Sequence, residues 1–289
     1  MTRHSCYVFS TLVLAAGICL HVTPAVAQTP SSTSSSANSS SQGASDDAAS
    51  LDPIEPDYYL VNLPTALRLP VKGGNFHLTH RFNENWRRDD FSEVAKNFFG
   101  IDEGAVIGLE FRFGIMKNLQ AIAMRTNVGR TIQLSGKYDA LHQSDSTPLS
   151  LSLLGSVEGL DNFSKQFSPA FGVVLARSFA SRIAFYAIPV WAGNTAPSAT
   201  TGDTSTAYIG LGTRIRFLET AYLVGEFTPR FGGYVVNDPE YAFSIEKRVG
   251  AHVFSLVWAN GQGTTFGQLA RGGNPESLYF GFNLTRKFF

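Results

Sequence analysis

Large apolar side chains alternate with polar ones along most of the chain after Gly73. In the stretch 105–113, four apolar residues share one face: Ile107, Leu109, Phe111 and Phe113. Glu110 and Arg112 lie on the opposite face. Successive side chains of a β-strand point to opposite sides of the sheet, so this alternation predicts strands with one apolar and one polar face.

The same alternation predicts about twelve strands. They span residues 75–82, 105–113, 118–126, 130–140, 148–157, 169–179, 182–192, 205–217, 220–230, 241–249, 251–260 and 277–288. Most have about ten residues, the length that a tilted strand needs to cross a bilayer. No uninterrupted apolar stretch of about 18 residues follows Gln28, which excludes membrane-spanning helices. We therefore predict an all-β fold, a transmembrane antiparallel up-and-down β-barrel, with a soluble β-sandwich as the alternative.

The connections between the predicted strands favour the membrane barrel. If the C-terminus lies in the periplasm, five long connections face outward, at 83–104, 158–168, 193–204, 231–240 and 261–276. Short turns then face inward near Met116, Ser181, Glu219 and Gly250. Two connections depart from this alternation, a short one near Asn127 and a longer one around Ser144. Long outer loops and short inner turns are typical of outer-membrane barrels.

The N-terminal part predicts export. Arg3, an apolar run from Tyr7 to Leu20 and the small residues before Gln28 are typical of a cleaved signal peptide over residues 1–27. Ten of the 23 residues in 28–50 are serine, a composition that predicts a disordered linker. Residues 51–72 are rich in proline and predict an extended periplasmic segment docked below the barrel. The barrel then takes up residues 73–289 and places the protein in the bacterial outer membrane.

Cysteine, charge and histidine usage narrow the chemistry. Both cysteines, Cys6 and Cys19, fall inside the predicted signal, so the mature chain has no thiol chemistry. Removal of the signal leaves 22 basic residues (23 − 1) against 23 acidic ones, and this near-neutral balance argues against nucleic acid as a partner. His77 and His80 are three apart on a strand and face opposite sides, so they cannot share a metal ion. We expect no cofactor and no metal site.

The final predicted strand is amphipathic and runs into an aromatic C-terminus. Its apolar face carries Leu278, Phe280, Phe282, Leu284 and Phe288, and Phe289 follows as the last residue. Outer-membrane barrels commonly end in such a strand, which the outer-membrane insertion machinery recognises. We therefore expect that machinery and the outer-membrane lipid as partners, while a solute or protein partner cannot be inferred.

Three segments together resemble an uncharacterised family of bacterial outer-membrane β-barrel proteins, a domain-of-unknown-function family. They are Asn97–Arg125, which contains the run Asn97, Phe98, Phe99, Gly100, Ile101, Asp102; residues 250–254 together with Asn260; and Phe280–Arg286. His80, Arg81 and Phe82 also fit the first-strand pattern of that family. The sequence departs from the pattern at Ala251, where a second glycine is common. The resemblance covers about Tyr59 to Phe289 and implies a fold and a location, but no activity.

Charged residues on the predicted inner face are the strongest functional signal. Strand parity places twelve of them toward the lumen: Glu110, Arg112, Arg125, Lys137, Asp139, Glu158, Arg214, Arg216, Glu226, Arg230, Glu246 and Arg248. Charges on the lipid face would be costly, which supports this placement. They can form a salt-bridge network that fills the lumen, or they can line a narrow pore. Because seven of the twelve are basic, the second hypothesis predicts a mild preference for anions.

Two function classes therefore stay open. One is a narrow passive pore or transporter for small polar or anionic solutes, and the other is a closed barrel with a structural, binding or anchoring role. Barrels of about eight strands are filled and porins of sixteen or more are open, so a count of about twelve does not decide. A membrane phospholipase with His252 on the lipid face is a weaker, enzymatic alternative, and we predict no enzyme.

The outer loops carry two further expectations. Residues 83–104 contain Trp86, Phe98 and Phe99, enough to make a short helix that folds over or into the mouth of the barrel. A solvated surface loop is the favoured interpretation of this segment, and a lid or receptor surface is the alternative. Residues 261–276 contain several glycines and Arg271, and we expect this loop to be mobile rather than preorganised.

Overall fold

The computed structural model describes residues 54–88, 90–196 and 202–288 of the chain. The predicted signal peptide and serine-rich linker, the last residue Phe289 and two short gaps lie outside these residues. All described residues belong to one compact unit, Ser45–Phe289. Within them, no helix is long and apolar enough to cross a membrane.

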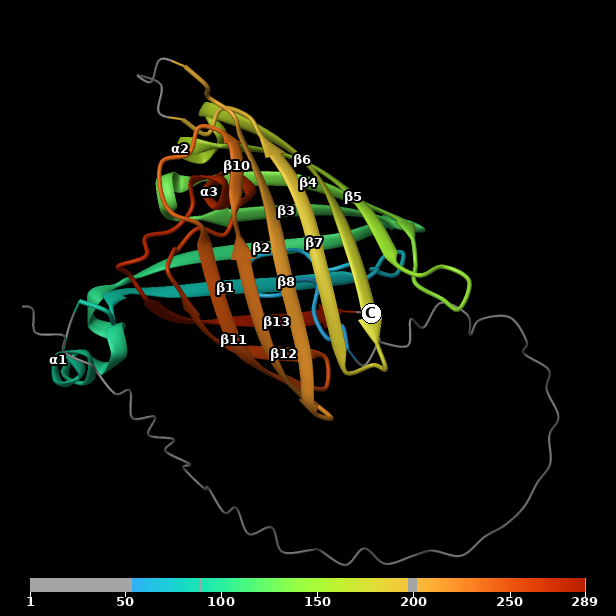
Figure 1. Ribbon diagram of the computed structural model, residues 1–289, viewed down its shortest axis with the longest axis horizontal. Coiled ribbons are helices and arrows are strands. Elements are labelled where there is room, and N and C mark those ends of the chain that lie inside the picture. Colours follow the sequence, from blue (N-terminus) through green and yellow to red (C-terminus); the bar gives the residue numbers. More distant parts are fainter. Residues whose placement is uncertain (1–53, 89, 197–201, 289) are drawn as a thin grey trace, which may run out of the picture. The chain divides into compact units, whose positions relative to one another are not determined.

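The described residues form one antiparallel sheet that closes into a barrel (Figure 1). Its strands are β1 (Gly74–Asn85), β2 (Ala105–Met116), β3 (Leu119–Thr126), β4 (Ile132–Leu141), β5 (Ser150–Gly159), β6 (Lys165–Phe179), β7 (Ile183–Ala192), β8 (Thr206–Leu218), β9 (Ala221–Thr228), β10 (Arg230–Gly233), β11 (Glu240–Val249), β12 (His252–Ala259) and β13 (Tyr279–Phe288). Each predicted strand has a counterpart in this set.

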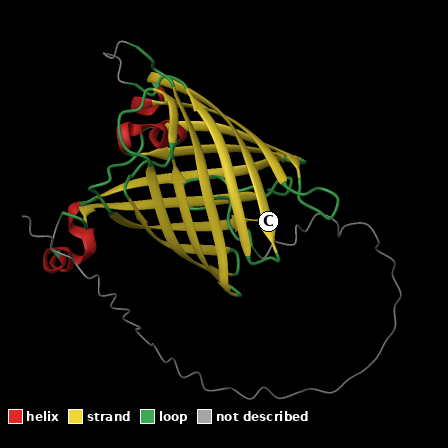
Figure 2. Cartoon of the chain, viewed as in Figure 1, coloured by secondary structure: helices red, strands yellow, loops and turns green. Residues whose placement is uncertain are grey.

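The pairings of β1 with β13 and of β8 with β9 close the sheet into a wall of twelve strands (Figure 2). Strand β1 pairs with β13, with Leu78 opposite Leu284. Strand β8 pairs with both β9 and β10, and β10 continues β9 beyond Pro229. The predicted barrel of about twelve strands is therefore confirmed. A closed barrel pairs every strand edge, which hydrocarbon requires of a backbone that crosses it.

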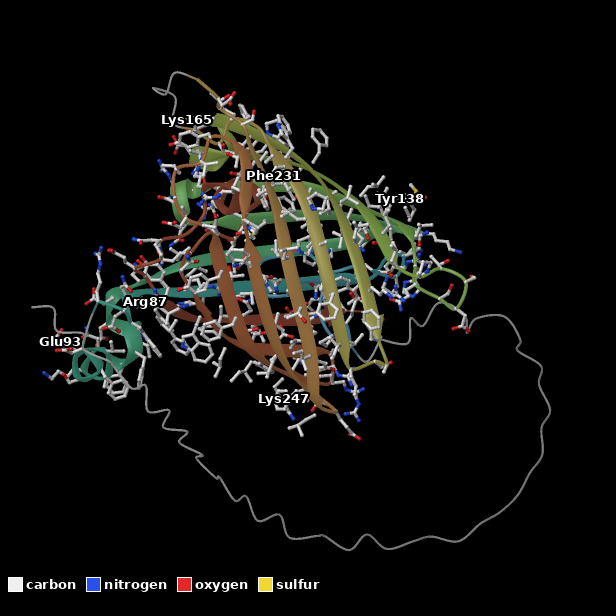
Figure 3. All side chains as sticks on the ribbon, in the orientation of Figure 1. Arg87, Glu93, Tyr138, Lys165, Phe231 and Lys247 are labelled. Atoms are coloured by element: carbon white, nitrogen blue, oxygen red, sulfur yellow. The ribbon has the colours of Figure 1, made fainter. Side chains whose placement is uncertain are left out.

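The predicted alternation places apolar side chains on the outer surface. Phe111 is 51% exposed and Tyr138 is 47% exposed, while Glu110 and Lys137 on the other parity are 1% and 0% exposed. Figure 3 shows Tyr138 on the outside of the barrel. The inward charges are therefore kept away from the surface that faces hydrocarbon.

The connections define two ends of the barrel. Short turns at 117–118, 180–182, 219–220 and 250–251 lie at one end, as predicted, and we call it the inner end. The opposite, outer end carries η2 (Val128–Arg130) between β3 and β4, and α2 (Leu160–Phe163) between β5 and β6. Strands β5 and β6 extend further than expected, so the connection predicted at 158–168 shrinks to 160–164.

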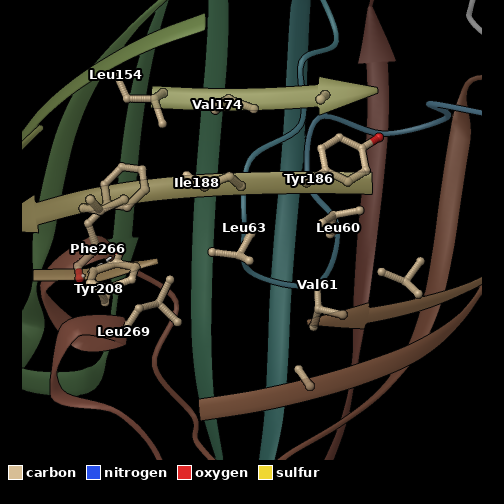
Figure 4. Close-up of a cluster of buried hydrophobic side chains, with 14 of the residues drawn as sticks. Leu60, Val61, Leu63, Leu154, Val174, Tyr186, Ile188, Tyr208, Phe266 and Leu269 are labelled. Atoms are coloured by element: carbon tan, nitrogen blue, oxygen red, sulfur yellow. Dashed lines mark hydrogen bonds between the residues drawn. The ribbon is translucent and has the colours of Figure 1, made fainter. Parts of the chain in front are cut away.

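The segment before the barrel lies inside the lumen. We expected residues 51–72 below the barrel, but all residues from Ile54 to Leu67 are buried. Leu60, Val61 and Leu63 of this segment belong to one buried apolar cluster with Tyr186 and Ile188 of strand β7 (Figure 4). The prolines do keep the segment out of the sheet. Some of its peptide groups bond to luminal side chains, as Val61 does to Glu226, and others bond within the segment, as Leu60 does to Leu63, so buried polar groups are paired without a strand ladder.

A short helix of the outer end also packs into the lumen. Helix α3 (Phe266–Arg271) begins with a capping box, in which the Thr265 hydroxyl accepts a hydrogen bond from the backbone N–H of Gln268. Phe266 and Leu269 belong to the same buried apolar cluster as Leu63. The expectation that residues 261–276 are mobile is therefore wrong, because the capping box and the buried apolar side chains order the helix despite its glycines.

The long connection between β1 and β2 contains α1 (Phe91–Lys96) and η1 (Phe98–Glu103). The predicted short helix is therefore present, and Figure 3 shows Arg87 and Glu93 on this connection, at the outer end. It does not cover the mouth, however. Phe98, Phe99 and Ile101 instead face the outer surface of the wall across a groove, because apolar residues such as Leu256 and Phe282 line that surface.

Candidate functional site in the barrel lumen

The tip of the luminal segment is a tight turn held by one carboxylate. The backbone N–H of Leu60 donates to the carbonyl of Leu63 at 2.8 Å, which closes the turn. Glu226 of strand β9 accepts backbone N–H groups from Val61, Asn62 and Leu63 at 2.7, 2.9 and 2.8 Å. Successive amides that point to one place form a concave binding site for an anion. Here the anion is a side chain of the barrel wall.

The wall leaves room for this turn where two glycines occur in strand β8. A Cβ atom at Gly210 would lie 2.7 Å from Cδ2 of Leu63, closer than two carbon atoms can approach. A Cβ atom at Gly212 would collide with Leu60. The shape of strand β8 is therefore fitted to the luminal segment.

Asn62 extends the contact from β9 to the neighbouring part of the wall, beginning with β11, which is paired with β9. Its amide Nδ2 donates to Glu240 at 3.2 Å, and its Oδ1 accepts from the guanidinium of Arg81 at 3.1 Å. Arg81 also donates to Asn283 Oδ1 at 2.7 Å, and Asn283 Nδ2 donates to the carbonyl of Val61 at 2.9 Å. Strands β1, β11 and β13 thus all reach the same turn.

Three buried ion pairs of the wall bind or lie beside the rest of the segment. Arg214 pairs with Glu246 at 2.9 Å and donates to the carbonyl of Tyr59 at 2.7 Å. Lys137 pairs with Asp139 at 2.8 Å and donates to the carbonyl of Leu67 at 2.8 Å. Buried charges need such additional hydrogen bonds to offset the loss of water.

The third pair joins Arg112 to Glu110 at 3.2 Å. The hydroxyl of Tyr59 donates to Glu110 at 2.5 Å, and the Arg112 guanidinium lies 5.1 Å from the centre of the Tyr59 ring. Burial, and then the neighbouring Glu110 carboxylate, raise the pKa of Tyr59 well above its usual value. Its phenol therefore stays protonated and keeps donating to Glu110.

One cavity beside these contacts is small. A cavity between Tyr59, Asn62, His77, Glu110 and Thr264 has a volume of about 10 Å³, about the room that one water molecule needs. The described part of the chain therefore packs the middle of the lumen with the segment 54–70 and its hydrogen-bond partners. We call residues 54–70 the luminal plug.

Eight of the twelve sequence-predicted luminal residues are buried in the lumen: Glu110, Arg112, Lys137, Asp139, Glu158, Arg214, Glu226 and Glu246. Three others are partly exposed and lie toward the strand ends: Arg216, Arg230 and Arg248. Arg216 donates to the carbonyl of Glu219 in the inner turn, and Arg230 donates to the carbonyl of Arg271 at the end of α3.

The assignment of Arg125 to the lumen is wrong. Arg125 is exposed on the outer surface, where it is paired in the sheet with Ile132, and it donates to Asn162 Oδ1 at 3.0 Å. The inward positions of strand β3 carry Ile122 and Met124 instead, 6% and 4% exposed. These apolar side chains face the packed lumen, so in β3 the apolar residues do not mark the lipid side.

The sequence interpretation also missed luminal charges on three strands. Arg81 of β1, Glu240 of β11 and Lys287 of β13 are buried at 1%, 2% and 4% exposure. The alternation that was applied to β2 would have found Arg81, because Thr79 and Arg81 alternate with the apolar residues Leu78 and Phe82 along the strand. Glu240 was missed because the predicted strand began at residue 241.

The corrected charge list removes the basis for an anion preference. Among the described wall residues that face the lumen, six buried ones are acidic: Glu110, Asp139, Glu158, Glu226, Glu240 and Glu246. Five are basic: Arg81, Arg112, Lys137, Arg214 and Lys287. The plug adds Glu55 and Asp57, so the buried luminal charges are eight acidic (6 + 2) against five basic.

The histidines give no support to catalysis or metal binding. His77 faces the lumen and His80 stacks on Phe282 outside, with ring centres 4.8 Å apart, as the strand parity predicted. Within the described ranges, no three His, Cys, Asp or Glu residues are grouped to hold a metal ion. His252 stacks on Phe254, 6.1 Å away, on the outer surface. No serine hydrogen-bonds to it in the described part of the chain, so the phospholipase hypothesis gains nothing.

The closed wall and its polar, filled interior define a membrane-bound β-barrel protein. Residues 57–288 match the family model of the membrane bound beta barrel domain DUF5777. This match covers most of the chain, and the protein belongs to that family. The resemblance to an uncharacterised barrel family is therefore confirmed, and the family match begins within the luminal plug.

Solved structures of other barrels are similar at low identity. The NanC porin is 8% identical with a TM-score of 0.48, and the alignment covers 74% of this chain and 99% of the porin. The COG4313 outer membrane channel from Pseudomonas putida F1 is 9% identical with a TM-score of 0.47, and the alignment covers 76% and 97% of the two chains. No curated protein matches the sequence.

Proposed function

We propose that the protein is an outer-membrane channel for small polar solutes whose resting state is closed by the luminal plug. The observation that carries this proposal is the way in which the plug is held. Its tip is bound by side chains, above all Glu226 and Asn283, and the plug adds no strand to the barrel sheet. The plug can therefore leave without breaking any backbone hydrogen bond of the wall.

The nature of the wall behind the plug supports the same function. Its inner face carries buried charges such as Arg112, Lys137 and Glu226, which would be hydrated once the plug has left. A barrel that is closed only for structural reasons can fill its interior with side chains from its own strands. Here a separate part of the chain fills it. We infer that the solute class is small and polar, without an assigned charge.

A closed barrel with a structural or anchoring role is the second candidate, and helix α3 favours it. The backbone N–H of Phe266 donates to Gln133 at 2.9 Å, and that of Gly267 donates to Glu158 at 3.2 Å. These bonds tie α3 to strands β4 and β5 independently of the plug. Under this candidate, α3 keeps the barrel closed after the plug is removed.

Conductance measurements with and without residues 54–70 test the proposal. The full chain, refolded and inserted in a planar bilayer, should show rare and brief openings, whereas the chain without the plug should conduct steadily. Different gel migration of boiled and unboiled samples verifies that both barrels are folded. If the folded plug-deleted barrel never conducts, the structural candidate replaces the channel. Steady conductance of the full chain would contradict closure by the plug.

A further inference from the structure

The connection between β1 and β2 is fixed to the outer surface of the barrel. Gly100 has a φ of +101°, which favours glycine, and a Cβ atom there would lie 2.8 Å from Cβ of Phe82. Asn97 Nδ2 donates to Glu84 Oε1 at 3.0 Å, and Asn83 Nδ2 donates to the carbonyl of Glu103 at 3.2 Å. We call residues 97–103 the outer flap, because both of its ends are bonded to β1.

A groove runs between the outer flap and the barrel wall. Its volume is about 510 Å³. The flap contributes Phe98, Phe99 and Ile101, and the wall contributes outward-facing residues that include Leu256 and Phe282. The groove is therefore lined mainly by apolar side chains on the surface that faces the lipid.

Aromatic contacts give the groove a defined shape. The rings of Trp86 and Phe99 lie 5.8 Å apart, and those of Trp86 and Phe280 lie 5.0 Å apart. Phe280 also contacts Phe82, with ring centres 5.8 Å apart. Packed rings have few accessible rotamers, so the groove is present before any ligand enters.

The two sides of the connection differ sharply in polarity. A recess of about 600 Å³ near the groove is lined by polar residues, among them Asn83, Arg88, Lys96 and Asn97. On the groove side, Phe98 and Ile101 are 68% and 61% exposed. A segment with one polar and one apolar side is stable where water meets hydrocarbon. This polarity places the outer flap at the membrane boundary at the outer end.

We propose that the groove binds one acyl chain of an outer-leaflet membrane lipid and retains that lipid. At this position hydrocarbon chains surround the protein, and a chain in the groove contacts the flap on one side and strands β12 and β13 on the other. At Phe171 of β6, by contrast, an acyl chain can contact the protein on one side only. An inserted peptide would bring polar backbone groups to a surface with few hydrogen-bond partners, which disfavours a protein occupant.

Lipid retention can be counted by native mass spectrometry of the full-length protein extracted from membranes in mild detergent. One lipid should remain bound to the wild-type barrel through repeated detergent washing. Phe99→Ser replaces one apolar side chain of the groove with a polar one. Gly100→Val pushes the flap away from β1 without replacing any side chain that lines the groove. Each variant should reduce the retained lipid several-fold. Phe171, whose side chain is 62% exposed on the outer face of β6, provides the matched control. Phe171→Ser should leave the amount of retained lipid unchanged.

The outcomes are decisive because gel migration shows separately whether each variant is folded. Phe99→Ser leaves the backbone of the flap unaltered and provides the test if Gly100→Val does not fold. Equal lipid retention in the wild type, Phe99→Ser and Phe171→Ser would overturn the proposal. Finding a free fatty acid or only detergent in the groove would also overturn it. Conductance is not part of this measurement, so the result is independent of the proposed channel function.

Discussion

The carboxylate of Glu226 lies 2.7 Å from the backbone nitrogen of Val61 and joins the barrel wall to the tip of the luminal plug. The two residues are 165 positions apart in the sequence. Because Glu226 also accepts the next two amides, one wall side chain satisfies the whole turn. If the lumen opens by release of the plug, as proposed, these amides must lose their acceptor.

Removal of this carboxylate should therefore release the plug. Glu226→Ala leaves three backbone N–H groups buried without an acceptor, and even one such group costs about 1–3 kcal/mol. We expect at least a tenfold increase in the frequency of channel openings, since about 1.4 kcal/mol corresponds to a factor of ten. Single-channel recording of the refolded variant measures this frequency.

Two further variants control this experiment. Glu226→Gln keeps one acceptor oxygen and should have a smaller effect than Glu226→Ala. Glu219→Ala removes an exposed carboxylate from an inner turn and should leave the openings unchanged. If all three variants behave like the wild type, the turn at Val61 is not what holds the plug.

A disulfide between the plug and the wall should lock the lumen reversibly. Cγ of Leu63 lies 3.3 Å from the position of a Cβ atom at Gly210, a spacing compatible with a disulfide when both residues become cysteine. Both natural cysteines, Cys6 and Cys19, precede the described residues. The double variant Leu63→Cys with Gly210→Cys should lose its openings after oxidation and regain them after reduction.

Single cysteine variants at the same positions provide the matched control. Neither Leu63→Cys nor Gly210→Cys alone can form the bond, so their openings should not respond to oxidant. Conductance of the oxidised double variant, with the disulfide verified by mass spectrometry, would show that solutes pass while the plug is in place.

The sequence predicted the wall well because strand alternation is a local property. Leu134 and Lys137 have opposite parity and opposite exposure, 45% and 0%, as expected for a sheet between hydrocarbon and a polar interior. The lumen could not be predicted in the same way. Whether residues 54–70 lie below or inside the barrel depends on partners such as Glu226, which no local pattern connects to them. Helix α3, by contrast, could have been predicted from a local pattern, because Thr265 and Gln268 have the spacing of a capping box.

Strand parity placed Arg112 in the lumen correctly and Arg125 there wrongly. The two residues give a third prediction. Arg112 is 0% exposed and paired with Glu110, so Arg112→Leu leaves a buried carboxylate without its partner and should cost about 3–5 kcal/mol. Arg125 is exposed near the end of β3, and Arg125→Leu should change stability by less than about 0.5 kcal/mol. Urea titration in detergent, followed by gel migration, measures both. A large loss for Arg125→Leu would restore its original luminal assignment.

The buried phenol of Tyr59 predicts how stability depends on alkaline pH. Its pKa is raised in the folded state, chiefly by burial and then by Glu110, whereas in the unfolded chain a tyrosine titrates at about 10. The stabilising effect of the protonated phenol is therefore complete below about pH 10 and is lost as the pH rises above that value, because only the unfolded chain then releases the proton.

Tyr59→Phe cannot titrate. The difference in unfolding free energy between the wild type and Tyr59→Phe should thus stay constant from about pH 7 to 9 and shift against the wild type at about pH 11. Comparing the two proteins cancels the titration of all other groups, which both share. A difference that is independent of pH up to about 11 would mean that Tyr59 titrates alike in the folded and unfolded chain, and so does not stay protonated against Glu110 in the lumen.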